Sequence, residues 1–425
     1  MNNPDTSLIR RATIVLLFTQ SIASAAFITC TTVNPLVMAK LSGQDALAGV
    51  PSALMLAGAS LAAYPAGQMM GRLGRRYGLM IGCALGLGGA LLSGLSAVTS
   101  NLLFFLIGLF ILGAGRVTLD QSRYGAAEIN PPERRARAIS TVIFGGTIGA
   151  ILGPALVAPS GDIAGKLGLA ELSGPFFTTS ILFVFIAGFI FVLLNMDMRA
   201  MATRAASRHA QNEAAKPDKP VTAARDAQPL TILDLLRIRN ARIALITMIS
   251  AQATMVMMMA IISLHMTLHD HGLGDVSLVI SAHVLGMYAF SPIIGQLADR
   301  LGRRVMIFAS ALIIGAGCVI APLSLMTPWI GLALFLIGLG WSGCYITGST
   351  LLTDAIAIHE RARMQGANET LVNVASAVGS LSSGVMLQLF GFNILSMIGL
   401  CVALLPLLAM LMTRPPALRK EPMTA

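Results

Sequence analysis

The side chains best suited to chemistry are a few polar residues set at helical intervals inside long apolar runs. Glu369 and Asn373 begin one such series, which continues through Ser376, Ser380 and Ser383, so that all five share one face of a helix. A polar group inside an apolar helix is costly and tends to point into a cavity. Serine more often bonds a neighbouring helix, but the carboxyl group of Glu369 indicates a functional site, and we expect Asn373 to line it.

Two further pairs have the same character. Gln20 and Asn34 share a face of the run 13–38, and we expect both to line a substrate cavity. Trp341 and Tyr345 are one helical turn apart. The two rings could stack on a planar ligand or a cation, or they could serve ordinary packing.

Arg116 and Asp120 are also one turn apart. Arginine ahead of aspartate at this spacing is the poorer orientation for an ion pair, so two alternatives are open. Either the two side chains neutralise each other, or Arg116 is free and favours an anionic or carboxylate-bearing substrate. Asp120 and Glu369 are also candidates for proton coupling.

Histidines gather in one stretch between two apolar runs. His265, His269 and His271 stand there, and His283 follows about two turns into the next run. Imidazole is a common ligand of transition metals, so these four residues could form a metal path. Against this, the first three do not share one helical face. His283 alone, inside an apolar run, is a candidate for proton coupling.

Apolar helices long enough to cross a bilayer must position these side chains. The chain has 425 residues, of which 55% are hydrophobic and 11% are charged, and its mean hydropathy is +0.77. Soluble proteins carry about 25% charged residues, so lipid must replace water around most of this chain. Twelve apolar runs fall near 13–38, 46–70, 79–98, 102–122, 138–160, 175–195, 242–264, 276–298, 305–326, 329–353, 367–390 and 391–412.

The net charge of +10 follows the order of these runs. With the N-terminus in the cytoplasm, all of the 29 Lys and Arg lie in cytoplasmic segments except Lys40, Lys166 and Arg116. Cytoplasmic loops of membrane proteins are enriched in these residues. We therefore expect a multi-pass protein of the inner (plasma) membrane with both termini in the cytoplasm. The basic excess sets the orientation and does not indicate a nucleic-acid partner.

Other classes of protein are disfavoured by what the sequence lacks. The five cysteines all lie in apolar runs without a CxxC pair, which is typical of small buried hydrophobic residues and not of disulfides or zinc sites. The sequence contains no phosphate-binding loop, zinc-protease motif or nucleophile elbow. It therefore predicts neither an enzyme nor a bound cofactor.

A ten-residue phrase marks an internal duplication. GQMMGRLGRR at 67–76 returns 228 positions later as GQLADRLGRR at 295–304. Each repeat holds six apolar runs, which predicts two pseudo-symmetric halves with the substrate path between them. The expected divisions are a first half at 1–195, a cytoplasmic linker with a short interfacial helix at 196–241, a second half at 242–412 and a tail at 413–425.

The repeated phrase, G-x-x-x-D-R-x-G-R-R in its complete form, resembles the signature loop of the major facilitator superfamily. The resemblance covers nearly the whole chain. It implies an all-α integral membrane fold with twelve transmembrane helices in two six-helix pseudo-symmetric halves, and we expect a monomer. It also implies a cytoplasmic gating role for Gly67, Arg72, Gly74, Arg75, Arg76, Gly295, Asp299, Arg300, Gly302, Arg303 and Arg304.

One acidic residue distinguishes the two copies. Asp299 could accept hydrogen bonds from a neighbouring helix N-terminus, or pair with an arginine, and so latch the two halves. The first copy has Gly71 at the equivalent position. We therefore expect Asp299 to carry the latch alone.

A second element bears on the type of transport. Gly149, Gly153 and Pro154, within GAILGP, resemble the G-x-x-x-G-P element of the family's antiporters, although the further glycine pair expected after it is absent. The nearest resemblance is to the drug/proton antiporter group.

These features predict a secondary transporter that moves a small organic solute by alternating access, with proton-coupled efflux as the expected mode. One alternative is a divalent-metal or metal-chelate transporter that uses the four histidines. The other is a polytopic membrane enzyme or receptor without transport, which the missing catalytic motifs disfavour.

Overall fold

The computed structural model describes residues 4–44, 47, 50–194, 200–201, 203–204, 207, 236–267, 269–271 and 273–412. Every regular element among them is a helix, which confirms the all-α class. The tail predicted at 413–425 and most of the linker predicted at 196–241 lie outside the described residues.

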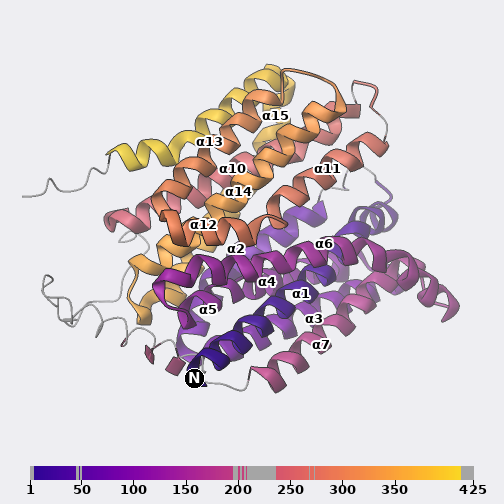
Figure 1. Cartoon of the computed structure of the whole chain (residues 1–425). Coiled ribbons are helices and arrows are strands. Elements are labelled where there is room, and N and C mark those ends of the chain that lie inside the picture. The colour runs from indigo at the N-terminus through magenta and orange to yellow at the C-terminus, as the bar shows by residue number, and fades with distance from the viewer. Residues whose placement is uncertain are drawn as a thin grey trace, which may run out of the picture.

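Two sets of helices make up the protein, and Figure 1 shows them as an indigo-to-magenta half against a pink-to-yellow half. The first half contains α1 (Pro4–Ser42), α2 (Val50–Leu73), α3 (Arg75–Thr99), α4 (Leu102–Asp120), α5 (Ser122–Ile129), α6 (Arg135–Lys166) and α7 (Gly174–Leu193), with short 3-10 helices η2 (Pro132–Arg134) and η3 (Glu171–Ser173). The second half contains α10 (Arg239–Thr267), α11 (Leu273–Tyr288), α12 (Ser291–Leu301), α13 (Arg303–Ile320), α14 (Thr327–Ala355) and α15 (Ile358–Met412).

The twelve expected spans can be followed along these helices. Ten helical segments of the described chain are long and apolar enough to cross a membrane. One of them is α15, whose 55 residues form two spans because Gly391, with φ of 76°, reverses the chain between them. The 24-residue α2 completes the twelve. Gly391 falls at the boundary that the sequence predicts between the last two spans.

One predicted boundary is wrong. The sequence predicts that the fourth span ends at 122, but the chain resumes as α5 after a break at Gln121 and continues to Ile129. All eight residues of α5 are buried. Arg123 therefore lies inside the helical bundle, and it is not a basic residue of the following loop.

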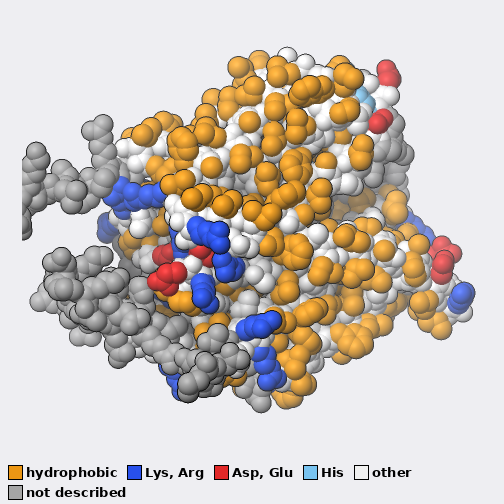
Figure 2. Space-filling view, in the orientation of Figure 1, with side chains coloured by type: hydrophobic (Ala, Val, Ile, Leu, Met, Phe, Trp, Pro, Cys, Tyr) orange, Lys and Arg blue, Asp and Glu red, His pale blue; other side chains and the backbone are white. Residues whose placement is uncertain are grey.

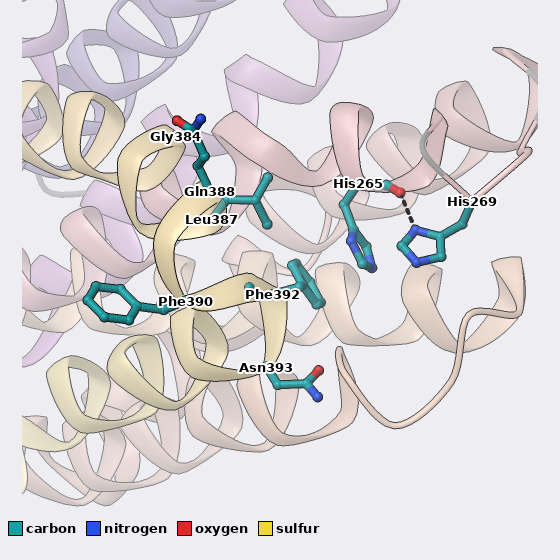
Figure 3. A pocket seen from close by; sticks show the side chains of 9 residues that line it. His265, His269, Gly384, Leu387, Gln388, Phe390, Phe392 and Asn393 are labelled. Carbon is teal, nitrogen blue, oxygen red and sulfur yellow. Dashed lines mark hydrogen bonds between the residues drawn. The ribbon is translucent and has the colours of Figure 1, made fainter.

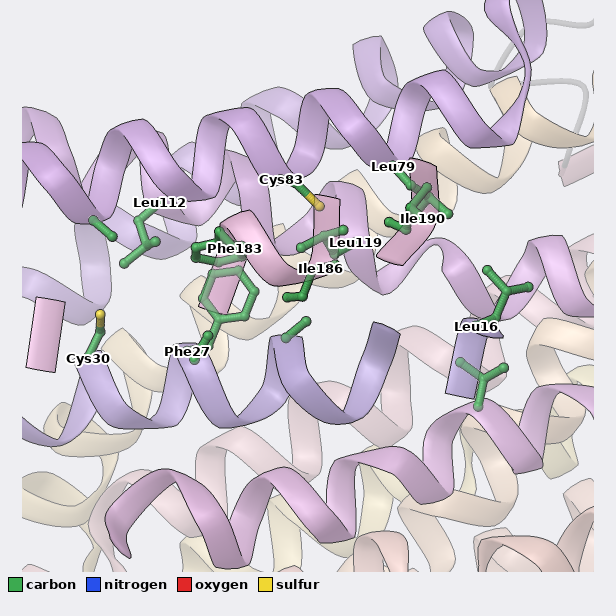
Figure 4. Packing of buried hydrophobic residues seen from close by; sticks show 14 of the residues in the cluster. Leu16, Phe27, Cys30, Leu79, Cys83, Leu112, Leu119, Phe183, Ile186 and Ile190 are labelled. Carbon is green, nitrogen blue, oxygen red and sulfur yellow. The ribbon is translucent and has the colours of Figure 1, made fainter. Parts of the chain in front are cut away.

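Helix packing repeats between the halves. In the first half α1 packs on α6 and α3 packs on α4, and in the second half α10 packs on α15 and α13 packs on α14. The core of the first half brings together side chains from α1, α3, α4 and α7, where the ring of Phe27 meets that of Phe183 edge to face, with centroids 5.3 Å apart (Figure 4). Such rings fix the helices that carry the central polar residues.

The halves meet through two equivalent helix pairs, α2 with α15 and α12 with α6. Each contact depends on the first glycine of the repeated phrase. A Cβ atom on Gly67 would collide with the backbone of Ala362, and one on Gly295 would collide with Ser140. Glycine at these positions therefore permits the close approach of the two halves.

The molecular surface divides into an apolar band and two polar ends. In Figure 2 hydrophobic side chains cover the broad face, and Lys and Arg gather at the left. We call this end, which contains residues 72–76 and 300–304, the basic end. The opposite end, which contains His265 and His269, we call the histidine end.

The antiporter-like element gives a first testable expectation about packing. Gly149 of α6 lies against α1, where an added Cβ would collide with Ser24 and with the backbone of Ala25. We expect Gly149→Ala to destabilise the protein by about 1–3 kcal/mol, because overpacking forces the helices apart. The matched control is Gly88→Ala, since Gly88 has nothing within 4 Å of an added Cβ. Thermal unfolding in detergent measures both, and an equal midpoint for the two variants would contradict the packing role.

Candidate functional site: the inter-half polar centre

A buried ion pair joins the two halves inside the membrane-spanning helices, on the side of their midpoints nearer the basic end. Arg123 Nη2 of α5 lies 2.6 Å from Glu369 Oε1 of α15, and the two side chains are only 5% and 3% exposed. Two buried charges are stable together only when their remaining hydrogen-bonding groups are also satisfied. Glu369 meets this condition, because it accepts hydrogen bonds from the Tyr124 hydroxyl at 2.9 Å, the Asn368 amide at 3.1 Å and the Tyr345 hydroxyl at 3.2 Å.

Arg123 is held from several sides. Its Nη1 donates to the backbone carbonyl of Asp120 at 2.8 Å, and its Nη2 donates to the Tyr345 hydroxyl at 2.8 Å. The guanidinium also lies over the rings of Tyr345 and Tyr124, at 4.4 and 4.6 Å from their centroids. Arg123 lies on α5, directly after the break at Gln121, and its guanidinium contacts Tyr345 and Glu369 of the second half.

Trp341 and Tyr345 extend the centre into the second half. Their rings stack with centroids 4.7 Å apart. Trp341 Nε1 donates to Gln252 of α10 at 2.7 Å, and the Gln252 amide donates to Ser376 of α15 at 2.9 Å. A continuous set of contacts therefore links α14, α10 and α15 to the buried ion pair.

Arg116 and Asp120 occupy the first-half side of the same centre. Arg116 Nε lies 3.8 Å from Asp120 Oδ2, and the side chains are 52% and 32% exposed. Gln20 donates to Asp120 at 3.2 Å and accepts from Ser122 at 3.1 Å. Both side chains also interact electrostatically with Tyr288 of the second half.

Asp299 makes both of the contacts that the sequence suggests for it. Its carboxylate accepts hydrogen bonds from the backbone N–H groups of Ala136 at 3.2 Å and Arg137 at 2.9 Å, at the N-terminus of α6. It also pairs with Arg303 at 3.0 Å. The hydrogen bonds from Ala136 and Arg137 join α12 of the second half to α6 of the first, whereas the pair with Arg303 lies within the second half.

Further ion pairs lie beside this contact at the basic end. Arg135 pairs with Asp354 at 2.5 Å across the halves, and Arg303 pairs with the same carboxylate at 3.4 Å. In the first half Arg75 pairs with Glu128 at 2.6 Å and also donates to Gln365 of the second half. The two repeats thus place equivalent arginines, Arg75 and Arg303, against equivalent acidic residues.

The other residues of the repeated phrase lie at the surface or in turns. Gly74 and Gly302 have φ of 91° and 92°, which glycine adopts without strain. Arg72 and Arg300 are exposed. Arg76 donates to the carbonyl of Phe191, and Arg304 donates to Asn240.

The model of the Major Facilitator Superfamily matches residues 16–274 and 243–424 of the chain. The protein belongs to the major facilitator superfamily. It is therefore a multi-pass membrane transporter of a family that binds small-molecule substrates, as predicted from the signature loop.

Relatives share nearly the full length of this superfamily member. It is 33% identical over 402 residues to the MFS-type transporter YdeG of Bacillus subtilis, covering 94% of this chain and 91% of YdeG. It is 25% identical over 413 residues to the riboflavin transporter RfnT of Brucella anthropi, covering 97% and 98%. The crystal structure of the human organic anion transporter MFSD10 matches its fold with a TM-score of 0.73 at 15% identity, covering 96% of this chain and 100% of that one.

The transporter does not bring all of the predicted site residues together. Asn34 is buried between α1 and α2, where its amide lies 3.4 Å from Met55 Sδ. His283 is buried in the second half, and its Nδ1 lies 2.8 Å from the carbonyl oxygen of Leu334. Asn373 donates to the backbone of Glu369 on its own helix. Of the candidate cavity and coupling residues, the centre collects Gln20, Arg116, Asp120, Trp341, Tyr345 and Glu369.

Three residues that bond Glu369 directly escape the sequence analysis: Arg123, Tyr124 and Asn368. Arg123 is hidden because the polar segment 122–129 lowers the local hydropathy, so that it is counted with the loop. The available signal is the mixture of Tyr, Gly and Ala around one arginine, which suits a buried helix better than a solvated loop. Asn368 lies next to Glu369 but outside its helical face, so periodicity does not single it out.

A separate pocket of about 650 Å³ lies at the histidine end, between the end of α10 and the reversal in α15 (Figure 3). His265 stacks on Phe392 with centroids 3.9 Å apart, and its ring lies 4.5 Å from that of His269. Burial, followed by the neighbouring His269 and His271, lowers the pKa of His265 to about 4, so its imidazole is neutral at physiological pH. Within the described part of the chain, no three His, Cys, Asp or Glu residues are grouped so that they could hold a metal ion.

Proposed function

We propose that this transporter exports a small organic solute in exchange for protons, by alternating access, with the basic end in the cytoplasm. The proposal rests on the Arg123–Glu369 ion pair, because Glu369 is a buried acidic residue on the boundary between the halves. Protonation of Glu369 removes the charge that holds Arg123. The halves can then separate at the basic end at a lower cost.

The distribution of contacts supports a state that is closed on the proposed cytoplasmic side. Hydrogen bonds and ion pairs between the halves of the described chain lie at the level of Glu369 or closer to the basic end, as with Asp299, Arg135 and Arg75. In the opposite state these contacts must break together. A proton that loosens the central pair therefore acts on the same equilibrium as the basic-end contacts.

The antiporter-like element of α6 supports exchange of solute for protons over transport of both in the same direction. Gly149 and Gly153 pack against Ser24, Ala25 and Ile28 of α1. The Thr29 hydroxyl also donates to the carbonyl of Gly153 at 3.0 Å. This tight α1–α6 contact holds the first half rigid while it moves relative to the second.

Proteoliposomes that contain the purified protein and a trapped pH dye test the proposal. A panel of neutral, cationic and anionic organic solutes, with divalent metal ions added as the alternative cargo, is applied with and without a pH gradient. We expect some organic solutes, and no metal ion, to drive protons in the opposite direction to their own. Proton movement in the same direction as the solute would contradict exchange, and no movement of any solute by folded protein would contradict transport.

A further inference from the structure

We propose that Arg116 recognises the substrate, that the substrate is a small organic anion with a flat ring, and that its carboxylate replaces Asp120 on the guanidinium. The assignment rests on the proposed transport function, and it names the chemical class that the central site selects. Proton exchange does not require that the substrate be an anion, so the transport function and the role of Arg116 can be tested separately.

The two ion pairs of the centre differ in how easily they open. Arg123 and Glu369 are buried and 2.6 Å apart, so a ligand that competed for either would have to uncover a charge. The Arg116–Asp120 pair is 3.8 Å apart, beyond hydrogen-bonding distance, and both side chains reach open space. The second pair is therefore the one that a substrate can enter.

Of the two partners in that pair, Arg116 has the unused bonding groups. Asp120 accepts a hydrogen bond from Gln20 and stays close to the Arg123 cation, which also donates to its backbone carbonyl at 2.8 Å, after its partner leaves. Nη1 and Nη2 of Arg116 donate no hydrogen bond to any residue that the structure describes. Two parallel N–H groups of a guanidinium match the two oxygens of a carboxylate. The site thus offers a cationic fork, which selects an anion.

Packing holds this fork in place. The Arg116 guanidinium lies over the ring of Phe27 at 5.9 Å, and Phe27 is fixed by its contact with Phe183 in the first-half core. A ring beneath one face of the guanidinium leaves its edge free for in-plane hydrogen bonds. The side chain is therefore partly pre-organised for a planar partner, which lowers the entropy cost of binding.

The second half supplies a flat surface opposite the fork. Tyr288 lies within electrostatic range of Arg116 and Asp120 and is partly exposed. Its ring is positioned by an edge-to-face contact with Trp341, with centroids 6.3 Å apart. An anion with an aromatic ring can contact Arg116 of the first half and Tyr288 of the second at once. Such a ligand stabilises the approach of the halves, as a transported substrate must.

Matched probes in the full-length protein test the assignment. Benzoate, 1-naphthoate and indole-3-acetate are compared with their amides, with the corresponding amines and with a ring-free acid, acetate. Affinity is read from tryptophan fluorescence and from competition with solute-driven proton flux. We expect ring carboxylates to bind more tightly than each of the three matched compounds.

Variants at Arg116 separate charge from shape. We expect Arg116→Gln to weaken ring carboxylates about 10- to 100-fold and to remove their advantage over the amides, because charged hydrogen bonds are lost. Arg116→Lys should keep part of the preference, since it retains charge but not the fork. Lys166→Gln, at the histidine end of α6, is the charge-matched control and should change nothing. Thermal unfolding confirms that each variant is folded.

Each result decides between the two proposals. If the wild-type protein moves amides or amines as well as acids, or if Arg116→Gln keeps the preference for acids, the assignment of Arg116 is wrong and transport stands. If the folded wild-type protein moves no solute, the proposed function fails first. Carboxylate selectivity that disappears only in the Arg116 variants supports both.

Discussion

Glu369→Gln is expected to abolish coupling to the pH gradient while the protein continues to exchange solute passively, and to lower the unfolding midpoint, because buried Arg123 loses its anionic partner. Glutamine has the shape of the protonated acid and can still accept hydrogen bonds from Arg123 and Tyr124. It cannot take up or release a proton. The measurement is solute counterflow without a gradient, which should persist, against solute-driven proton flux, which should fall to the background of empty liposomes.

Arg123→Gln is the informative partner variant, because it removes the opposite charge. It leaves the Glu369 carboxylate buried without a cation, which costs about 3–5 kcal/mol in comparable pairs and should lower the unfolding midpoint. The double variant Arg123→Gln with Glu369→Gln carries neither charge and should regain much of this stability without regaining coupling.

The matched control is Glu360→Gln, on the same helix. Glu360 pairs with Arg363 of its own half at 2.5 Å and, among the residues that the structure describes, makes no ion pair with the first half. We expect normal coupling in this variant. Coupling that survives in Glu369→Gln would show that another group carries the proton, and Asp120 would be the next residue to neutralise.

Patterns that depend on one helix are the ones that could be predicted. The series on one face of the eleventh span identifies Glu369, and the reversal at Gly391 follows from the limit on the length of a membrane-spanning helix. The repeated phrase predicts equivalent contacts because duplicated sequences fold alike, and Asp299 meets a helix N-terminus.

What could not be predicted depends on which helices face each other. Gln20 and Asn34 share a face of α1, yet only Gln20 reaches the centre, because Asn34 is about 14 residues, or 21 Å, further along the helix. His283 has the chemistry of a coupling residue but is buried within one half. Periodicity places residues on a face and does not say what the face meets.

Gly71→Asp is expected to slow transport by adding a second latch at the basic end. Asp299 accepts hydrogen bonds from the first backbone N–H groups of α6, next to Arg135. The counterpart of Ala136 in the second half is Ala362, which lies inside α15 directly after Arg361, and an added Cβ on Gly71 would lie at ordinary contact distance, 3.6 Å, from the Ala362 side chain. An aspartate therefore fits at 71 and would add a carboxylate near Arg361, whose Nη1 has no hydrogen-bond partner among the described residues.

The expected size follows from the bonds gained. A hydrogen bond to a charged group contributes about 1.5–3 kcal/mol, so one or two of them favour the closed basic end by about 10-fold or more. Turnover limited by opening of that end should fall by a similar factor. The measurements are the initial rate of solute-driven proton flux and the labelling rate of a cysteine introduced on the inter-half surface near the basic end.

Two variants define the cause of any slowing. Gly71→Ala adds the Cβ without the carboxylate and should leave the rate close to that of the wild type, while Asp299→Asn should weaken the existing latch and speed labelling. Arg361, the counterpart of Arg135, has an Nη1 without a hydrogen-bond partner in the described chain, whereas Arg135 pairs across the halves with Asp354. The contact around Arg361 therefore lacks the ion pair that Arg135 makes across the halves. The closed state is stabilised less for that reason and can still open. A normal rate in Gly71→Asp would mean that the basic-end contacts do not limit the cycle, and that the central ion pair alone sets it.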